Sequence, residues 1–209
     1  MSLYGRLFAR LYDRGIAASE RAGLTEQRAA LLADASGRVL ELGAGTGLNL
    51  GHYPAGAVRE LVLTEPEMPM LRRLEPRAAS ATPRATAVRA QAEQLPFDDA
   101  SFETVVSTLT LCTVDDLPAA LTEARRVLVP GGRLLFLEHV RAHDESAARR
   151  QDRFAPIWRR FGHGCHCNRD TLAAITAAHF EVERVEHGRF PKAPRIIEPL
   201  ISGAAVRPS

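Results

Sequence analysis

The sequence is poor in several residue types, and each scarcity excludes a class of protein. Only three of its 209 residues are cysteines, Cys112, Cys165 and Cys167, too few for a disulfide framework; a reducing, cytoplasmic setting is expected. Arg6 and Arg10 interrupt the apolar N-terminus, and no apolar run elsewhere is long enough to cross a bilayer. The net charge is small, because 27 basic residues are nearly balanced by 25 acidic ones, so no overall electrostatic field predicts a nucleic-acid partner. A small-molecule ligand is the expectation.

The order of the apolar segments predicts one α/β domain, which also suits the length of the chain. From Arg38 onward, short apolar runs alternate with helical stretches, and this alternation is typical of a parallel sheet covered on both faces. Strands are expected at residues 38–43, 60–65, 84–90, 102–108, 132–140, 180–190 and 199–207. Helices are expected at residues 67–78, 116–128 and 168–180, the last with Asn168 as its cap.

Two amphipathic segments lie outside this alternating region. In residues 3–12, Leu3, Leu7 and Leu11 recur at helical spacing, and their apolar face is expected to pack on the domain, cover a substrate or lie on a membrane surface. Residues 145–161 combine apolar side chains at helical spacing with several arginines, interrupted by Pro156. The second segment is interpreted as a helical insertion.

The most informative stretch is residues 39–49, where an expected strand runs into a glycine-rich turn and then an expected helix. Gly43, Gly45 and Gly47 keep side chains out of the turn and let the backbone approach a nucleotide-like ligand. Taken alone, such a turn is equally compatible with an ordinary tight connection. The dinucleotide fingerprint G-x-G-x-x-G would need glycine where Leu48 stands, so NAD and FAD are disfavoured.

Further polar residues follow the next expected strands. Glu65 and Pro66 end the second strand, and an acid at that tip can accept hydrogen bonds from both hydroxyls of a ribose. Ala92 and Glu93 follow the third strand in a loop suited to bracket an adenine ring. Residues 107–112 follow the fourth strand, where they are expected to line the reaction site.

With these segments in this order, residues 36–140 resemble the class I S-adenosylmethionine-dependent methyltransferases, specifically the group related to ubiquinone and menaquinone biosynthesis methyltransferases. The resemblance rests on the glycine turn, the acid at the strand tip, and the segments AEQLPF, SFETVVS and RRVLVPGGRLLF. It implies a Rossmann-like α/β fold whose seven-stranded sheet is mostly parallel, with helices on both faces and an antiparallel last strand. The implied parts are a helical cap at 1–35, a cofactor-binding core at 36–140, a substrate-side helical insertion at 141–179 and C-terminal strands at 180–209.

The resemblance also implies a cofactor, S-adenosyl-L-methionine, and a set of site residues. The glycine turn would meet the amino-acid part of the cofactor, Glu65 its ribose, Ala92 and Glu93 its adenine, and Thr108 the approach to the methyl group. The expected cofactor-binding residues are Glu41, Gly43, Ala44, Gly45, Gly47, Asn49, Glu65, Pro66, Ala92, Glu93, Thr108 and Leu109.

A closer resemblance, to the microsomal alkyl thiol methyltransferases, covers much of the remaining chain. It is carried by residues 47–49 with Tyr53-Pro54, by 108–114, by 138–140, and by 164–165 followed by 168–170. The resemblance implies that the methyl acceptor is a small thiol. The alternatives are C- or O-methylation of a quinone-like or phenol-like molecule, and a cofactor-binding module without catalysis.

Candidate catalytic groups are few. Besides Thr108, His139 at the end of the fifth strand is the first candidate for a general base, and a hydrogen-bonded structural histidine is an equal alternative. Residues 163–167 offer two thiols and two imidazoles, but four ligands within five residues do not easily close a tetrahedron, so no metal is expected. Cys112 is interpreted as a small residue behind the transfer site.

Overall fold

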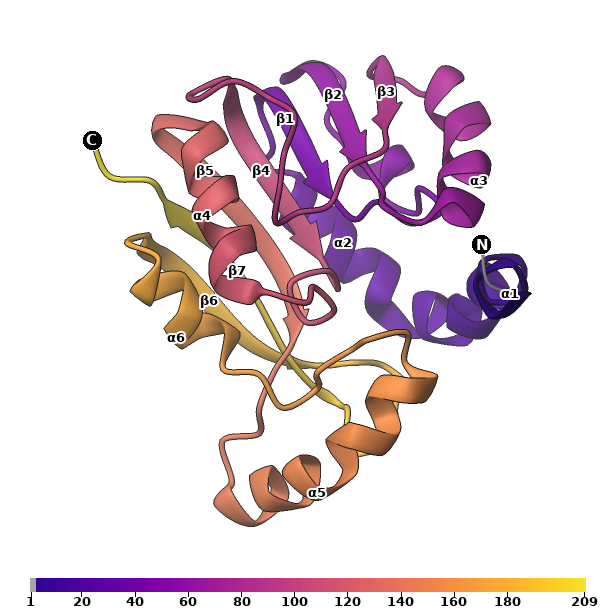
Figure 1. Cartoon of the computed structure of the whole chain (residues 1–209). Coiled ribbons are helices and arrows are strands. Elements are labelled where there is room, and N and C mark those ends of the chain that lie inside the picture. Colours follow the sequence, from indigo (N-terminus) through magenta and orange to yellow (C-terminus); the bar gives the residue numbers. More distant parts are fainter. Residues whose placement is uncertain (1–2) are drawn as a thin grey trace.

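The computed structural model describes residues 3–209, except for the side chains of residues 3–6 and 8. The side chain of Leu3, which the predicted apolar face included, therefore lies outside the described residues. Seven strands form one sheet in the order β3-β2-β1-β4-β5-β7-β6 (Figure 1). The strands are β1 (Gly37–Leu42), β2 (Val58–Thr64), β3 (Ala85–Val88), β4 (Phe102–Thr108), β5 (Leu128–His139), β6 (Glu181–Arg189) and β7 (Pro199–Val206).

The pairing of these strands confirms the expected mixed sheet. The first five strands run parallel, since β1 pairs in parallel with β2 and β4, β2 with β3, and β4 with β5. The last strand, β7, is antiparallel to both of its neighbours, β5 and β6. In a parallel arrangement the carboxyl ends of β1, β2, β4 and β5 lie along one edge, where their polar residues gather.

Helices cover both faces of the sheet, as predicted. The helices are α1 (Leu3–Ser19), α2 (Thr25–Leu32), α3 (Met68–Ala79), α4 (Leu117–Val127), α5 (Glu145–Phe161) and α6 (Thr171–Ala177), with short turns η1 (Glu20–Leu24) and η2 (Leu50–His52). Successive strand residues point to opposite faces, so Val39 lies in the same apolar cluster as Leu31 of α2, whereas Leu40 lies in the cluster that contains Leu121 of α4. Two apolar layers result, one with α2 and α3 and the other with α4 and α6.

Two helices lie near the carboxyl edge of the sheet rather than on its faces. In Figure 1, α5 lies beyond the end of β5, and α1 lies beside the end of α3. Contrary to the expected interruption, α5 continues through Pro156. That proline is exposed, so water can satisfy the carbonyl group that loses its helical donor. None of the helices in residues 3–209 is long and apolar enough to span a membrane.

Two other local predictions were wrong. No α-helix follows the glycine turn, since residues 46–53 form turns and the short η2. Gly51 and Pro54 leave too few good helix formers there to sustain a longer helix. The cap of α6 is Asp170 rather than Asn168, because the Asp170 carboxylate accepts a hydrogen bond from the Ala173 backbone N–H at 3.0 Å.

Candidate functional site

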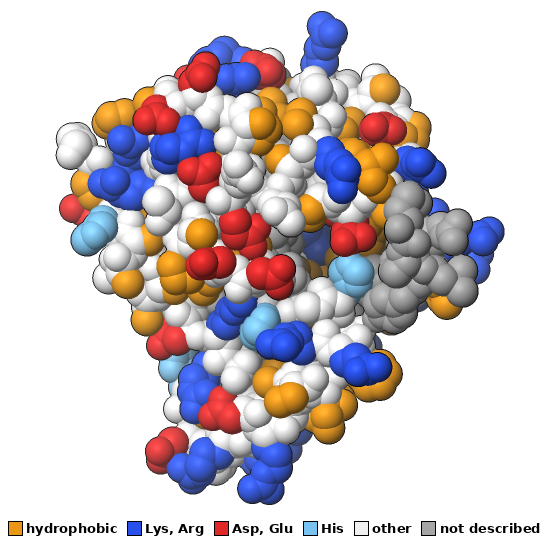
Figure 2. All heavy atoms as spheres, viewed as in Figure 1, with side chains coloured by type: hydrophobic (Ala, Val, Ile, Leu, Met, Phe, Trp, Pro, Cys, Tyr) orange, Lys and Arg blue, Asp and Glu red, His pale blue; other side chains and the backbone are white. Residues whose placement is uncertain are grey.

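A cavity of about 680 Å³ opens at the carboxyl edge of the sheet, where ligands bind in open α/β folds. Figure 2 shows a hollow on this face with acidic side chains around it and arginines gathered over α5. Glu65 follows β2 and His139 ends β5, so three strand spacings, about 14 Å in all, separate the two parts of the sheet that border the cavity. We call these parts the Glu65 end and the His139 end.

Eight of the expected cofactor-binding and catalytic residues line this cavity. Seven of them belong to the glycine turn and the loops after β2, β3 and β4, and the eighth is the catalytic candidate. They are Gly43, Gly45, Glu65, Pro66, Ala92, Glu93, Leu109 and His139. Volumes of this order accommodate a nucleoside-sized ligand together with a small second molecule.

Glu65 is held in a defined orientation at the first end of the cavity. Its Oε2 accepts a hydrogen bond from the Gly45 backbone N–H at 2.9 Å, and its Oε1 accepts one from the Glu67 N–H at 2.8 Å. The side chain is buried, and this burial raises the pKa of the carboxyl group to about 7. Each carboxylate oxygen keeps a further lone pair for a ligand hydroxyl group.

The three positions of the turn require glycine for different structural reasons. A Cβ atom at Gly43 would lie 2.6 Å from Thr110 Cγ2, and one at Gly47 would lie 2.8 Å from side-chain atoms of Leu50 and Leu74. At Gly45, whose φ is +58°, a Cβ atom would meet no described protein atom within 4 Å. Gly43 and Gly47 therefore permit packing, whereas Gly45 faces the open space of the cavity.

Three other expected cofactor residues lie beneath the turn and outside the cavity lining. Asn49 Nδ2 donates to Glu41 Oε1 at 2.9 Å and to Thr108 Oγ1 at 2.8 Å, while Tyr53 donates to Glu41 Oε2 at 2.6 Å. The buried Arg28 donates to Asn49 Oδ1 at 3.0 Å and to Thr108 Oγ1 at 3.2 Å. Burial raises the pKa of Glu41. This network supports the turn from below, and no sequence pattern indicates that Arg28 takes part in it.

Ala44 and Gly47 also hold the turn together, through backbone hydrogen bonds. The Ala44 N–H donates to the Thr64 carbonyl at 2.8 Å, and the Gly47 N–H donates to the Ala44 carbonyl at 2.9 Å. These bonds close the turn and join it to the end of β2. Ala44 is packed in the apolar layer of α2 and α3.

Within the loop after β4, which was expected to line the reaction site, Thr110 lines the cavity and Thr108 does not. Leu109 has a φ of +59° and turns the chain, so Thr108 points into the network under the turn while Thr110 lines the cavity. Thr110 Oγ1 donates to the Leu42 carbonyl at 3.0 Å. Glu93, on the facing loop, accepts from the Asp115 N–H at 2.9 Å and thereby ties the two loops together.

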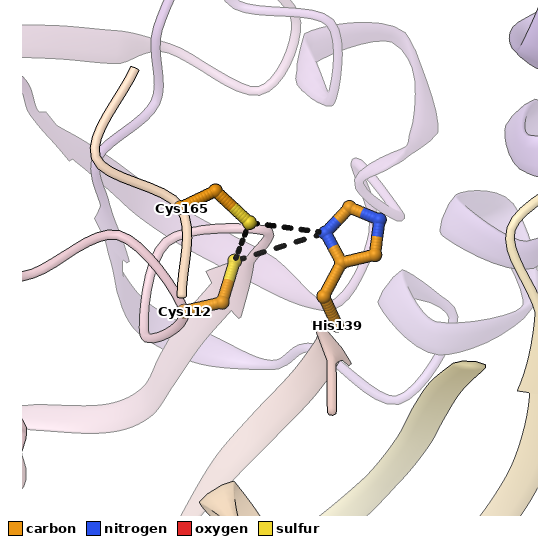
Figure 3. Close-up of side chains that lie close together, drawn as sticks. All are labelled: Cys112, His139 and Cys165. Atoms are coloured by element: carbon orange, nitrogen blue, oxygen red, sulfur yellow. Dashed lines mark hydrogen bonds between the residues drawn. The ribbon is translucent and has the colours of Figure 1, made fainter. Parts of the chain in front are cut away.

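The His139 end contains a group that the sequence did not bring together. Cys112, His139 and Cys165 converge from the loop after β4, the end of β5 and the loop after α5 (Figure 3). The two sulfurs lie 3.8 Å apart, and His139 Nδ1 lies 3.9 Å from Cys112 Sγ and 3.7 Å from Cys165 Sγ. Cys165 belongs to the 163–167 cluster, but its partners come from elsewhere in the chain.

The surroundings of these three residues are largely apolar. The ring of Phe190 stacks on His139 with centroids 4.8 Å apart, and Trp158 packs against the buried cysteines. The Cys112 thiol and then His139 lower the pKa of Cys165, whereas contact with Cys165 raises that of Cys112. Among the described residues, His139 Nε2 is buried without a hydrogen-bond partner.

Buried hydrogen bonds hold the two loops that carry Cys112 and Cys165. The Glu138 carboxylate accepts from the N–H groups of Thr110, Leu111 and Cys112 at 3.0 to 3.1 Å, so it holds the loop after β4. Burial raises the pKa of Glu138. The His166 N–H donates to the Cys112 carbonyl at 2.7 Å, which joins the loop after α5 to the loop after β4.

Comparison with known proteins gives a consistent result. A family model described as a methyltransferase domain matches residues 40–136. Thiol S-methyltransferase TMT1B of Rattus norvegicus is 35% identical over 173 residues, which cover 81% of this chain and 70% of that protein. Human thiol S-methyltransferase TMT1A is 31% identical over 172 residues, with the same two shares. A crystal structure of an S-adenosylmethionine-dependent methyltransferase from Thermotoga maritima superposes with a TM-score of 0.69 at 22% identity and covers 97% of both chains.

Proposed function

The chain belongs to the class I S-adenosylmethionine-dependent methyltransferases, in the family that includes the TMT1 proteins, and we propose that it methylates the sulfur of a small apolar thiol. The observation that carries the proposal is that one cavity joins the Glu65 end to an apolar end containing two sulfurs and an imidazole. Identity to relatives named thiol S-methyltransferases supports the same acceptor class.

The Glu65 end fits the cofactor of this family. S-adenosylmethionine, when bound, supplies a methyl group carried on a cationic sulfonium. Glu65 presents its free lone pairs to ribose hydroxyls, and the space beyond Gly45 leaves room for the ligand against the turn. The carboxylates of Glu67, Glu93 and Asp115 also line the cavity, and their negative charge suits a cationic ligand.

The His139 end meets the needs of a thiol acceptor. Methyl transfer from a sulfonium requires alignment of the two sulfurs and exclusion of water more than it requires a strong acid or base. Leu11 of α1 and Trp158 and Phe161 of α5 contribute apolar side chains to the lining, so both helices can cover an acceptor. The acceptor must lose its proton to become the stronger nucleophile, the thiolate.

The reaction that follows from this arrangement is an in-line displacement. An electron pair of the acceptor sulfur forms the new carbon–sulfur bond, and the methyl–sulfonium bond breaks, its electron pair remaining on the departing thioether. The thiol proton is released to solvent.

A turnover screen tests the acceptor class. Methyl-labelled cofactor would be incubated with a short alkyl thiol, the alcohol of the same shape, a phenol, an amine and a quinone precursor. We expect a methyl thioether and S-adenosylhomocysteine from the thiol. Product from the phenol or the quinone precursor alone would contradict the proposal in favour of O- or C-methylation, and cofactor binding without any product would indicate a non-catalytic module.

A pair of variants in α5 locates the acceptor. Trp158 lines the cavity, whereas its neighbour Ile157 is 56% exposed and does not belong to the lining. Trp158→Ala should raise KM for the thiol and leave the cofactor Kd unchanged, while Ile157→Ala should alter neither value. Equal effects of the two substitutions would place the acceptor elsewhere.

A further inference from the structure

We propose that Cys112, His139 and Cys165 bind one zinc ion whose fourth coordination position opens into the cavity. The inference rests on the proposed function, because the open position is where the acceptor thiol would bind. Two thiolates and one imidazole are preferred zinc ligands, and three protein ligands with one open position are the pattern of catalytic zinc sites.

The distances within the group match those around a tetrahedral zinc ion. Zinc bonds of about 2.3 Å to sulfur and about 2.0–2.1 Å to nitrogen place two sulfurs about 3.8 Å apart, and a sulfur and a nitrogen about 3.6 Å apart. The observed separations are 3.8 Å between the two Sγ atoms and 3.7 and 3.9 Å from them to His139 Nδ1. A single ion at the centre of the three atoms therefore needs movements of only a few tenths of an ångström.

The ligands are held in place by contacts that do not involve an ion. The Cys112 N–H donates to Glu138 Oε2 at 3.0 Å, and the Cys165 N–H donates to the Gly162 carbonyl at 3.1 Å. His139 is fixed at the end of β5 by its pairing with Leu200 of β7. Such preorganisation lowers the cost of assembling a metal site.

All three ligand residues line the cavity, so the fourth position of the proposed site would face it. In the part of the chain whose side chains are described, no fourth Cys, His, Asp or Glu joins their group. His163 also lines the cavity, and Cys167 is buried nearby, but neither belongs to the group. A solvent or substrate atom is left to complete the tetrahedron.

Charge gives this arrangement a function in methyl transfer. Zn²⁺ with two thiolates and a neutral imidazole has no net charge, so it does not repel the sulfonium. A bound acceptor thiolate would make the group negative and attractive to that cation. An acceptor thiol bound at the open position would release its proton to solvent. The electron pair of its sulfur would then form the bond to the methyl carbon while the methyl–sulfonium bond breaks, its electron pair remaining on the departing thioether, and the methylated product would leave the ion. Zinc thus lowers the pKa of the acceptor, and the imidazole need not accept the proton.

The prediction of no metal rested on the ligands within residues 163–167 alone. In the structure only Cys165 of that segment joins the group, together with His139, 26 residues away in the sequence, and Cys112, 53 residues away. The objection about ligand spacing therefore does not apply to this group.

Metal binding can be measured without turnover. The reduced chain, stripped with a chelator, would be titrated with zinc, and metal content would be determined by mass spectrometry. We expect one tightly bound zinc per chain. Replacement by Co²⁺ should give thiolate-to-cobalt absorption in the near ultraviolet, and addition of a short alkyl thiol should intensify it, because a third sulfur enters the coordination sphere.

Cysteine variants identify the ligands. Cys112→Ser and Cys165→Ser should each lower zinc affinity by at least about a hundredfold, since loss of a group that only hydrogen-bonds to a metal ligand already lowers affinity by up to about that factor. Cys167→Ser is the matched control, because Cys167 is equally buried but lies outside the group, and it should bind zinc normally. Thermal midpoints and cofactor affinity, measured on the same preparations, exclude general loss of folding.

The outcomes separate this inference from the proposed function. A wild-type chain that takes up no metal, or that forms a Cys112–Cys165 disulfide instead, would overturn the zinc site, and thiol methylation by that chain would leave the proposed function standing. Zinc binding with an unchanged cobalt spectrum on thiol addition would overturn the open position. A spectrum that responds to thiol in a chain without turnover would support the metal site and refute the proposed function.

Discussion

The Glu65 end of the cavity takes its shape from two neighbouring segments, whereas the His139 end is assembled from three segments that are distant in the sequence. Gly45 and Glu65 are 20 residues apart, follow adjacent strands and are joined by one hydrogen bond. Cys112, His139 and Cys165 meet only because the loops after β4 and α5 fold over the end of β5. A nucleotide-like ligand can thus be read from a local motif, while acceptor chemistry depends on tertiary structure.

The largest effect is expected from a valine in the turn at the Glu65 end. Gly45→Val should abolish cofactor binding, because the new side chain would project into the cavity from a backbone with φ of +58°. Calorimetric titration with S-adenosylmethionine measures the loss. Binding of zinc at the His139 end should persist, which would show that the two ends are independent.

The control for Gly45→Val is Gly131→Val. Gly131 also has a positive φ, +77°, and its Cβ atom would meet no described atom within 4 Å, but it lies at a turn in β5 away from the cavity. Both substitutions impose similar backbone strain, so both should lower the thermal midpoint. Loss of cofactor binding in both variants would mean that strain, not occupation of the cavity, is responsible.

A smaller effect is expected from Glu65→Ala. This substitution removes the hydrogen-bond acceptors for the ribose, and hydrogen bonds to charged groups are worth about 1.5–3 kcal/mol each. Cofactor affinity should fall at least tenfold, since 1.4 kcal/mol corresponds to about a factor of ten. Unchanged affinity in a folded variant would remove Glu65 from the cofactor site.

The pH dependence of cofactor binding offers a graded version of the same test. Burial raises the pKa of Glu65 to about 7, so below that pH the group is protonated and offers fewer acceptors. Affinity should decrease by up to about tenfold per pH unit as the pH falls below 7. Glu65→Gln should remove this pH dependence of the affinity. Because the titration of the ligand itself is common to both proteins, the difference between their affinities at each pH reports on Glu65 alone.

As the pH rises, the stability of the ligand-free chain should decrease, whereas its affinity for the cofactor should increase. A carboxyl group whose pKa is raised from 4.5 to about 7 on folding contributes stability below about pH 4.5, and that contribution is lost as the pH rises through 7. The free energy of unfolding of wild type, relative to that of Glu65→Gln, should therefore decline over this range. A flat difference would show that Glu65 titrates normally.

Much of the fold was predictable because its signals are local. The predicted strands at 102–108 and 199–207 agree with β4 and β7 to within one residue, since apolar runs and turn residues mark both ends. β5 begins at Leu128, four residues earlier than predicted, because Pro130 and Gly131 suggested a turn outside the strand. Local patterns fix element type more reliably than element ends.

The candidate site was less predictable for a geometric reason. The sequence identified Glu65 and Gly45, whose positions follow from the order of strands, and it placed residues 107–112 at the reaction site. Within that loop it singled out Thr108, whereas Thr110 lines the cavity. The positive φ of Leu109 decides which of the two threonines lines the cavity, and no periodicity encodes it. Convergence of Cys112 and Cys165 likewise requires knowledge of how two loops pack.

The smallest effect concerns α1, which links the two ends. Asp13 accepts a hydrogen bond from Thr46 Oγ1 of the glycine turn at 2.5 Å and pairs with Arg77 of α3 at 2.7 Å, while Leu11 and Tyr12 of the same helix line the cavity. Asp13→Ala should lower the free energy of unfolding by about 1–2 kcal/mol, because one charged hydrogen bond and a partly exposed ion pair are lost. Cofactor affinity should fall by less than about tenfold, since Gly45 and Glu65 remain.

Asp34→Ala is the matched control for this last change. Asp34 pairs with Arg184 at 2.8 Å on the surface, and neither residue lines the cavity. Its loss should cost less than about 1 kcal/mol and leave cofactor affinity unaltered. Denaturant unfolding and calorimetry on both variants would then measure the coupling through α1. If Asp13→Ala lowers stability but leaves cofactor affinity intact, α1 serves only the His139 end. If affinity also falls, the helix that covers the acceptor also stabilises the turn that binds the cofactor.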